Sequence, residues 1–195
     1  MKILATIGIA ITAFVTLVFG VISPKKTPAG PIISQSAGPA TFYMAAPSPT
    51  TRIGEIFPID IKVKADGMTL SAIATRVNYK YESSLAFEPK DADLKKDGIQ
   101  LKVSSDLAGK GWVFPINQVY IDSEEKLLTI DLAAVNLSPE GFKVDNEITL
   151  ATIDVLVVAS SPRLALAFDS GETKLLTKGG EEATLQLKDG IFAVR

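Results

Sequence analysis

The sequence of 195 residues contains no cysteine and no histidine. Without cysteine no disulfide can form, so the hydrophobic core alone must stabilise the fold. Histidine is the commonest general base, and together with cysteine it supplies the usual ligands of zinc and copper. Catalysis of the Ser-His-Asp or Cys-His kind is therefore excluded. We expect no enzyme, no catalytic residue, no metal site and no cofactor.

Excess charge of either sign is also lacking. Twenty lysines and arginines and 22 acidic residues give a net charge of -2, and the two signs are interspersed along the chain. A protein that binds the phosphate backbone of a nucleic acid needs a basic face. We therefore expect no nucleic-acid partner.

The most distinctive segment that is present is an apolar run over residues 3–22, which contains no charged residue. About 20 such residues form a helix long enough to cross the hydrocarbon core of a bilayer. Residues 1–23 are therefore predicted to be an uncleaved membrane anchor or a secretory signal peptide cut near Gly20. Either way the rest of the chain is expected at the cell surface or outside the cell, and it is secreted if the segment is cleaved.

Proline, serine, alanine and glycine dominate residues 24–40. Such a composition cannot bury enough apolar surface to offset the entropy lost on ordering. We predict an extended linker here, followed by one domain over residues 41–195.

Within this domain apolar and polar residues alternate, which is typical of half-buried β-strands. The alternation begins at residues 41–45 and is clearest at residues 57–64. A second clear segment places Ile73, Thr75, Val77, Tyr79 and Tyr81 on one face and Ala74, Arg76, Asn78 and Lys80 on the other. Further strands are predicted at residues 112–120, 127–135, 148–158, 163–168, 183–187 and 191–194.

The last two of these strands flank Lys188, Asp189 and Gly190, a sequence that predicts a hairpin turn. Residues 91–100 are rich in charge and predict a surface loop. No segment beyond the apolar run has a convincing helical period, so the domain is predicted to be all-β, an antiparallel sandwich or barrel.

Four segments resemble cohesin domains in their order and spacing. Residues 148–155 resemble a late core strand of that family, and Gly54 and Glu55 precede an early alternating strand as they do there. Residues 77–87 are similar to the family's tyrosine corner, and residues 187–194 to its terminal strand. The resemblance covers residues 41–195.

Similarity to cohesins implies a jelly-roll sandwich of about nine strands. It also implies a non-catalytic role in holding a partner protein, typically a dockerin module on an enzyme that degrades polysaccharide. The strand that ends at the tyrosine corner carries the partner contacts in this family, so Ala74, Arg76, Asn78 and Lys80 are the candidate binding residues. Arg76 is a long cation where cohesins carry acidic or small polar residues, which implies a different partner charge. Because Arg76 is expected on the outward face of its strand, Arg76→Glu is expected to leave the stability of the fold nearly unchanged.

Three other interpretations remain open. A carbohydrate-binding module on the same scaffold would contact polysaccharide through exposed rings, and Tyr43, Trp112 and Tyr120 are the available candidates. Ser123 and Lys126 have the spacing of a serine acyl-enzyme motif but lie where a turn between strands is expected. The aspartates of residues 91–98 could ligate calcium, although their spacing is not that of an EF-hand and a surface loop explains them as well.

Overall fold

The computed structural model describes residues 39–194, and in this range every regular element is a β-strand. No helix within these residues has the length and apolar character needed to cross a membrane. The apolar run over residues 3–22 and nearly all of the predicted linker lie outside the described residues. The strands are β1 (Ala40–Ala45), β2 (Thr50–Thr51), β3 (Ile56–Lys64), β4 (Thr69–Lys80), β5 (Phe87–Pro89), β6 (Lys102–Val103), β7 (Trp112–Asp122), β8 (Leu127–Asn136), β9 (Phe142–Lys143), β10 (Glu147–Val157), β11 (Ser161–Phe168), β12 (Lys174–Thr177), β13 (Leu185–Lys188) and β14 (Gly190–Val194).

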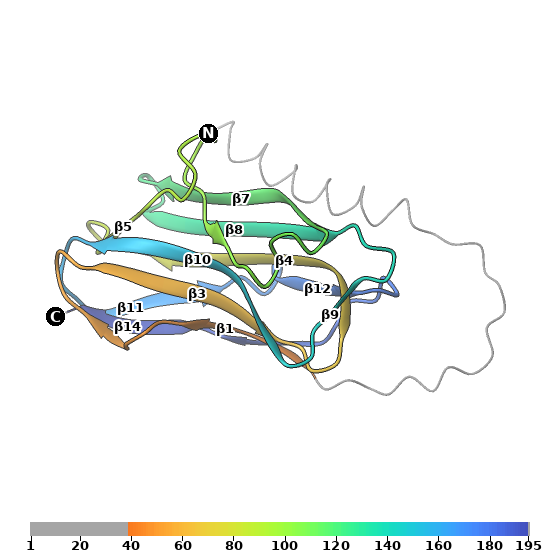
Figure 1. The fold of residues 1–195 in the computed structure, drawn as a ribbon. Helices are drawn as coiled ribbons and strands as arrows, with labels where there is room; N and C mark the ends of the chain where they lie inside the picture. Colours follow the sequence, from red (N-terminus) through yellow and green to blue (C-terminus); the bar gives the residue numbers. More distant parts are fainter. Residues whose placement is uncertain (1–38, 195) are drawn as a thin grey trace, which may run out of the picture. The chain divides into compact units, whose positions relative to one another are not determined.

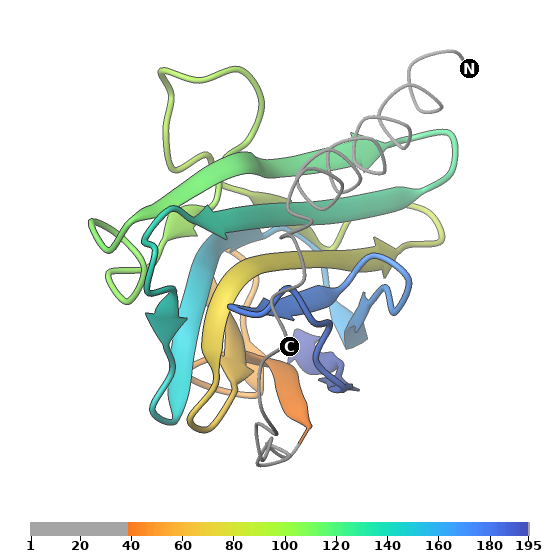
Figure 2. The same cartoon turned by 90° about the vertical axis from the view of Figure 1, so that its right-hand side faces the viewer.

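These strands form the two sheets of a β-sandwich (Figures 1 and 2). The first sheet has the order β13-β1-β3-β10-β5, and β6 also pairs with β10. The second has the order β2-β14-β11-β4-β8-β7, and β9 and β12 also pair with β4. The predicted all-β sandwich is thus confirmed, but residues 39–194 contain 14 strands rather than about nine. Four of them, β2, β5, β6 and β9, are only two or three residues long, too short for an alternating pattern to reveal. The strand pairings are antiparallel except for β1 with β13 and β14 with β2, which are parallel.

The alternation in the sequence corresponds to the two faces of each sheet. On β3 the side chains of Phe57, Ile59, Ile61 and Val63 are buried. On β4 the side chains of Ile73, Thr75, Val77 and Tyr79 are buried in the same way. Because strand side chains point alternately to opposite faces, the residues between these positions lie on the outer faces. Both predictions of facing are confirmed.

The core lies between the inner faces of the two sheets. Phe42 of β1 meets Phe168 of β11 edge to face, and the ring of Tyr79 on β4 stacks on Phe87 with centroids 5.0 Å apart. Ile153 of β10 is also fully enclosed. Close packing of this kind stabilises the fold in a chain that has no cysteine to form a disulfide.

The hairpin predicted around Lys188, Asp189 and Gly190 is wrong. β13 pairs with β1 in the first sheet, whereas β14 pairs with β11 in the second. The chain therefore crosses from one sheet to the other between these strands. At the crossing the Asp189 carboxylate accepts a hydrogen bond from the Phe168 N–H, and Gly190 lies against Met44. A turn signal in the sequence marks the change of direction but does not say which strand the chain pairs with next.

Candidate partner-binding face

The four candidate residues lie on the outer side of β4, the central strand of the second sheet. β4 pairs with β8, which in turn pairs with the edge strand β7. The register sets Ala74 opposite Ala133, Arg76 opposite Asp131, and Asn78 opposite Thr129. Lys80 ends the strand opposite Leu127 and is exposed.

Together these strands present one outer surface, which we call the β4–β8–β7 face. It consists of Ala72, Ala74, Arg76, Asn78 and Lys80 of β4, Leu127, Thr129, Asp131, Ala133 and Val135 of β8, and Val113, Ile116, Gln118, Tyr120 and Asp122 of β7. Small or uncharged side chains fill most of these positions. Ionisable acidic and basic groups occur at its centre and at one end.

The centre of the face is an ion pair between Arg76 and Asp131. The Arg76 Nε and Nη2 groups donate to the two Asp131 carboxylate oxygens at 2.7 and 2.9 Å. The Asp131 side chain is 6% exposed and that of Arg76 20% exposed. Bidentate pairs of this kind fix geometry as well as charge. The hydrogen bonds to Asp131 raise the pKa of Arg76 above its ordinary value, so the guanidinium stays charged.

This pairing corrects two expectations about Arg76. The arginine is not an isolated cation that inverts the charge of the face, because Asp131 neutralises it within the same sheet. Its replacement by Glu would set a second carboxylate against a buried one, so an unchanged stability no longer follows. The sequence did carry a signal, since Asp131 is the one charged residue in a mainly apolar strand and takes an outward position.

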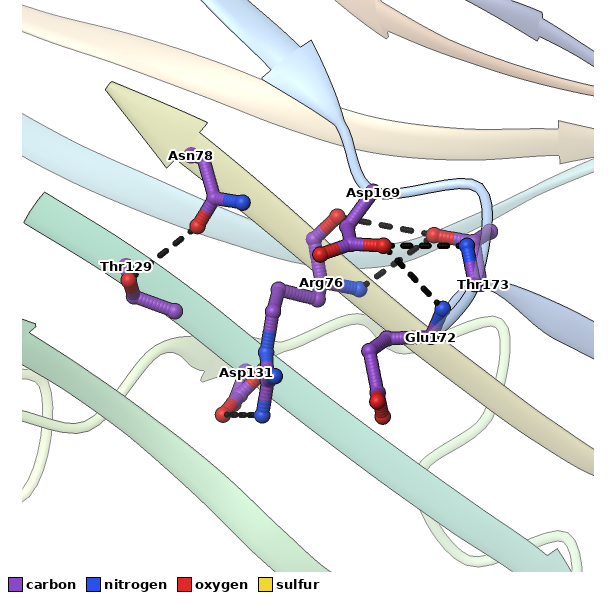
Figure 3. A network of polar contacts seen from close by, with 8 residues as sticks. Arg76, Asn78, Thr129, Asp131, Asp169, Glu172 and Thr173 are labelled. Carbon is purple, nitrogen blue, oxygen red and sulfur yellow. Dashed lines mark hydrogen bonds and ion pairs between the residues drawn. The ribbon is translucent and has the colours of Figure 1, made fainter. Parts of the chain in front are cut away.

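The loop between β11 and β12 completes the environment of Arg76 (Figure 3). β11 and β12 pair with different parts of the same edge of β4, and the ladder is interrupted between them. The Thr173 hydroxyl fills this gap, lying 3.4 Å from both the N–H and the carbonyl oxygen of Arg76. The Asp169 carboxylate accepts hydrogen bonds from the Gly171 and Glu172 N–H groups, which fixes the turn beside the arginine.

Four polar residues lie beside this pair: Asn78, Thr129, Gln118 and Tyr120. The sequence singled out Asn78 as a partner-binding candidate and Tyr120 only as a ring for sugar stacking. The Thr129 hydroxyl donates to the Asn78 side-chain carbonyl at 3.1 Å, which uses that oxygen (Figure 3). On β7, Gln118 lies opposite Asp131 and Tyr120 opposite Thr129. Both are half-buried, and burial raises the pKa of Tyr120. Their role depends on how β7 aligns with β8, which no short pattern in the sequence reveals.

The outer face of the first sheet has a different character. Tyr43 donates a hydrogen bond to Glu147, which also accepts one from Lys62 at 3.1 Å. These bonds lower the pKa of Glu147, while burial and then the bond to Glu147 raise that of Tyr43 to about 12. Charged groups of both signs therefore occupy the middle of this sheet, as is typical of a solvated surface.

The three rings considered for sugar stacking do not share a surface. Trp112 lies in the core, where it meets Phe142 edge to face. Tyr43 lies on the first sheet and Tyr120 on the second. Stacking on a glycan needs neighbouring rings that are exposed on one side. The arrangement of these three therefore gives no support to carbohydrate binding.

The remaining candidate motifs are accounted for by turns. Ser123 and Lys126 lie in the turn between β7 and β8, as the spacing of the strands predicts. In the loop before β6, the Asp91 carboxylate accepts hydrogen bonds from the Asp93 and Gln100 N–H groups. Within residues 39–194 no group of acidic side chains is arranged to hold a metal ion.

Comparison with known proteins places this architecture in a class of two-sheet β-sandwich modules. Neither a family model nor a curated protein sequence matches the chain. Solved structures do match. A type I cohesin from Clostridium thermocellum, held in a cohesin–dockerin complex, has a TM-score of 0.53 at 11% identity and covers 80% of this chain and 99% of its own.

Two further cohesins give the same result. A type II cohesin from Bacteroides cellulosolvens has a TM-score of 0.57 at 14% identity, covering 80% of this chain and 99% of its own. A non-cellulosomal cohesin from the archaeon Archaeoglobus fulgidus has a TM-score of 0.52 at 12% identity, covering 81% and 92%. The described part of the chain therefore has a cohesin-like fold. The resemblance in the sequence is confirmed at the level of the fold.

Proposed function

We propose that the chain is a non-catalytic binding module that captures a partner protein on the β4–β8–β7 face. The observation that carries the proposal is the combination of a cohesin-like fold with an outer sheet surface built on Ala74 and Ala133. Two alanines side by side on a sheet allow another backbone to approach closely, and their burial is not opposed by the desolvation of charges.

The opposite sheet supports this choice by contrast. Its outer surface carries the Lys62–Glu147 ion pair, and the Asp60 carboxylate accepts a hydrogen bond from Thr152 at 2.6 Å. The Glu147 side chain of that pair is 34% exposed, whereas Asp131 on the β4–β8–β7 face is 6% exposed, so a partner on the first sheet would have to desolvate more carboxylate surface. The two faces thus provide an internal comparison for any binding experiment.

A dockerin module is the kind of partner that the fold suggests, because solved cohesins of this architecture are found in complex with dockerins. The test is surface plasmon resonance of the full chain against the dockerins of those two complexes, with soluble glycans injected in parallel. Binding of a dockerin supports the proposal. Glycan binding together with the absence of any dockerin binding would favour a carbohydrate-binding module instead.

Matched substitutions identify the face that binds. Ala74→Arg places a long charged side chain in the middle of the β4–β8–β7 face, and Ala45→Arg does the same on the outer side of β1. We expect Ala74→Arg to weaken binding at least tenfold and Ala45→Arg to leave it unchanged. Equal effects of the two variants, or a larger effect of Ala45→Arg, would place the contact elsewhere.

We further propose that residues 3–22 tether this module to a membrane, with residues 24–40 as the spacer. The proposal is supported by the length and apolar character of the run, which match the thickness of a bilayer. Membrane fractionation under alkaline extraction tests it, because an integral anchor resists that treatment. Recovery of the chain in the soluble fraction, with a new N-terminus near Gly20, would show cleavage and rule out the tether.

A further inference from the structure

The two opposite charges at the centre of the β4–β8–β7 face are paired with each other within the domain. Two Arg76 N–H groups and both Asp131 oxygens are used in the pair, and Asp131 is almost completely enclosed. Glu172 and Asp169 lie close enough to add further negative potential around the guanidinium. A carboxylate on the partner would be repelled by this negative potential. A cation on the partner would have to compete with Arg76 for the Asp131 carboxylate, which is buried beyond its reach.

Neutral hydrogen-bonding groups surround the pair. Gln118 and Tyr120 lie beside it on β7, and within residues 39–194 neither the Gln118 amide nor the Tyr120 hydroxyl forms a side-chain hydrogen bond, whereas Arg76 is bonded to Asp131 and Asn78 to Thr129. The Gln118 amide and the Tyr120 hydroxyl therefore keep their capacity to bond to a partner. A site that offers neutral donors and acceptors rejects a partner that cannot satisfy them once they are buried.

We propose that the partner presents an uncharged, hydrogen-bonding surface to the centre of this face, because the Arg76–Asp131 pair is closed before the partner arrives. The proposal rests on the proposed function and adds the chemistry of the partner to it. Added salt hardly changes the energy of an ion pair that is already formed and partly buried. Binding that depends on opposite charges across an interface, by contrast, weakens as ionic strength rises. Binding by this face should therefore be nearly independent of salt.

The closed pair can be examined without any partner. In nitrogen–proton correlation spectra of the full chain, the Arg76 Nε–H signal should be visible and should exchange slowly with water, as expected for a donor held by a buried carboxylate. Asp131→Asn should remove that protection, while Asp145→Asn, which breaks the exposed pair with Lys143, should leave it unchanged. Fast exchange of the Arg76 signal in the unsubstituted chain would overturn the proposal.

The chemistry of the partner is tested by selection. A dockerin scaffold from one of the solved complexes, with its contact positions randomised, is displayed on phage and selected on the full chain and on its Asp131→Asn variant. We expect binders of the unsubstituted chain to carry uncharged residues at the central positions and to lose less than threefold in affinity between low and high salt. Binders of Asp131→Asn should be enriched in acidic residues, because that variant frees the Arg76 charge.

The outcomes separate this inference from the proposed function. Binders with charged central residues that weaken more than tenfold in high salt would overturn the inference while leaving the proposed function intact. Failure to select any binder on the β4–β8–β7 face would contradict the proposed function and with it the inference, even if the Arg76 signal is protected.

Discussion

The side-chain amide of Asn117 forms the same two hydrogen bonds with Leu101 that a neighbouring strand would form. The Leu101 N–H donates to the Asn117 oxygen at 2.9 Å, and the Asn117 nitrogen donates to the Leu101 carbonyl at 3.0 Å. Asn117 belongs to β7 of the second sheet, while the residues that follow Leu101 form β6 and pair with β10 of the first. The segment around Leu101 therefore joins the two sheets along one side and covers the edge of β7.

Substitution of Asn117 should weaken the fold measurably. Asn117→Leu keeps the side-chain volume but leaves the backbone groups of Leu101 unpaired in a buried place, which we expect to lower the free energy of unfolding by about 2 kcal/mol. Urea denaturation measures this change. Gln118→Leu on the same strand is the control, and an equal loss in both variants would contradict the role assigned to Asn117.

The Arg76–Asp131 pair predicts a strong coupling. Arg76→Met leaves the Asp131 carboxylate buried without its partner, and we expect a loss of about 3 kcal/mol. The double variant Arg76→Met/Asp131→Leu removes both charges and should recover most of that loss. A double-mutant cycle by chemical denaturation gives the coupling free energy, and additive single effects would show that the two groups do not interact.

Gly190 marks the crossing between the sheets. A Cβ at this position would lie 2.8 Å from a Phe192 ring carbon and 3.0 Å from the Met44 Cβ. Gly190→Ala should therefore destabilise the domain by about 2 kcal/mol through overpacking. Gly179→Ala meets its nearest atom at 3.8 Å and should have almost no effect on the thermal midpoint. Equal tolerance of both substitutions would favour an exposed turn at Gly190.

Alkaline pH should expose the role of Tyr43. Because its pKa is raised from 10.0 to about 12, the unfolded chain releases this proton first as pH rises. Its stabilising contribution is fully present below pH 10 and is lost as pH rises through about 12. Tyr43→Phe should lack that part of the decline in unfolding free energy, and the phenolate absorbance of the folded chain should lose a component that titrates near pH 12. Identical pH profiles would contradict the assignment.

The sequence predicts the layers of this fold better than its connections. Alternation over residues 57–64 and at residues 73–80 reports directly which side chains are buried, because facing is a local property of a strand. The pairing of Arg76 with Asp131 and the crossing at Gly190 depend instead on which strands become neighbours and in what register. Those choices are made by the whole core, so the candidate strand could be found from the sequence but its electrostatic balance could not.

The central claim is that a partner protein binds on the β4–β8–β7 face. Methyl spectra of the full chain labelled at alanine test it most directly, because Ala74 and Ala133 lie on this face and Ala45 on the opposite sheet. On addition of a dockerin that binds, we predict that the Ala74 and Ala133 methyl signals shift and that the Ala45 signal does not. A shift of Ala45 with Ala74 and Ala133 unchanged would contradict the account.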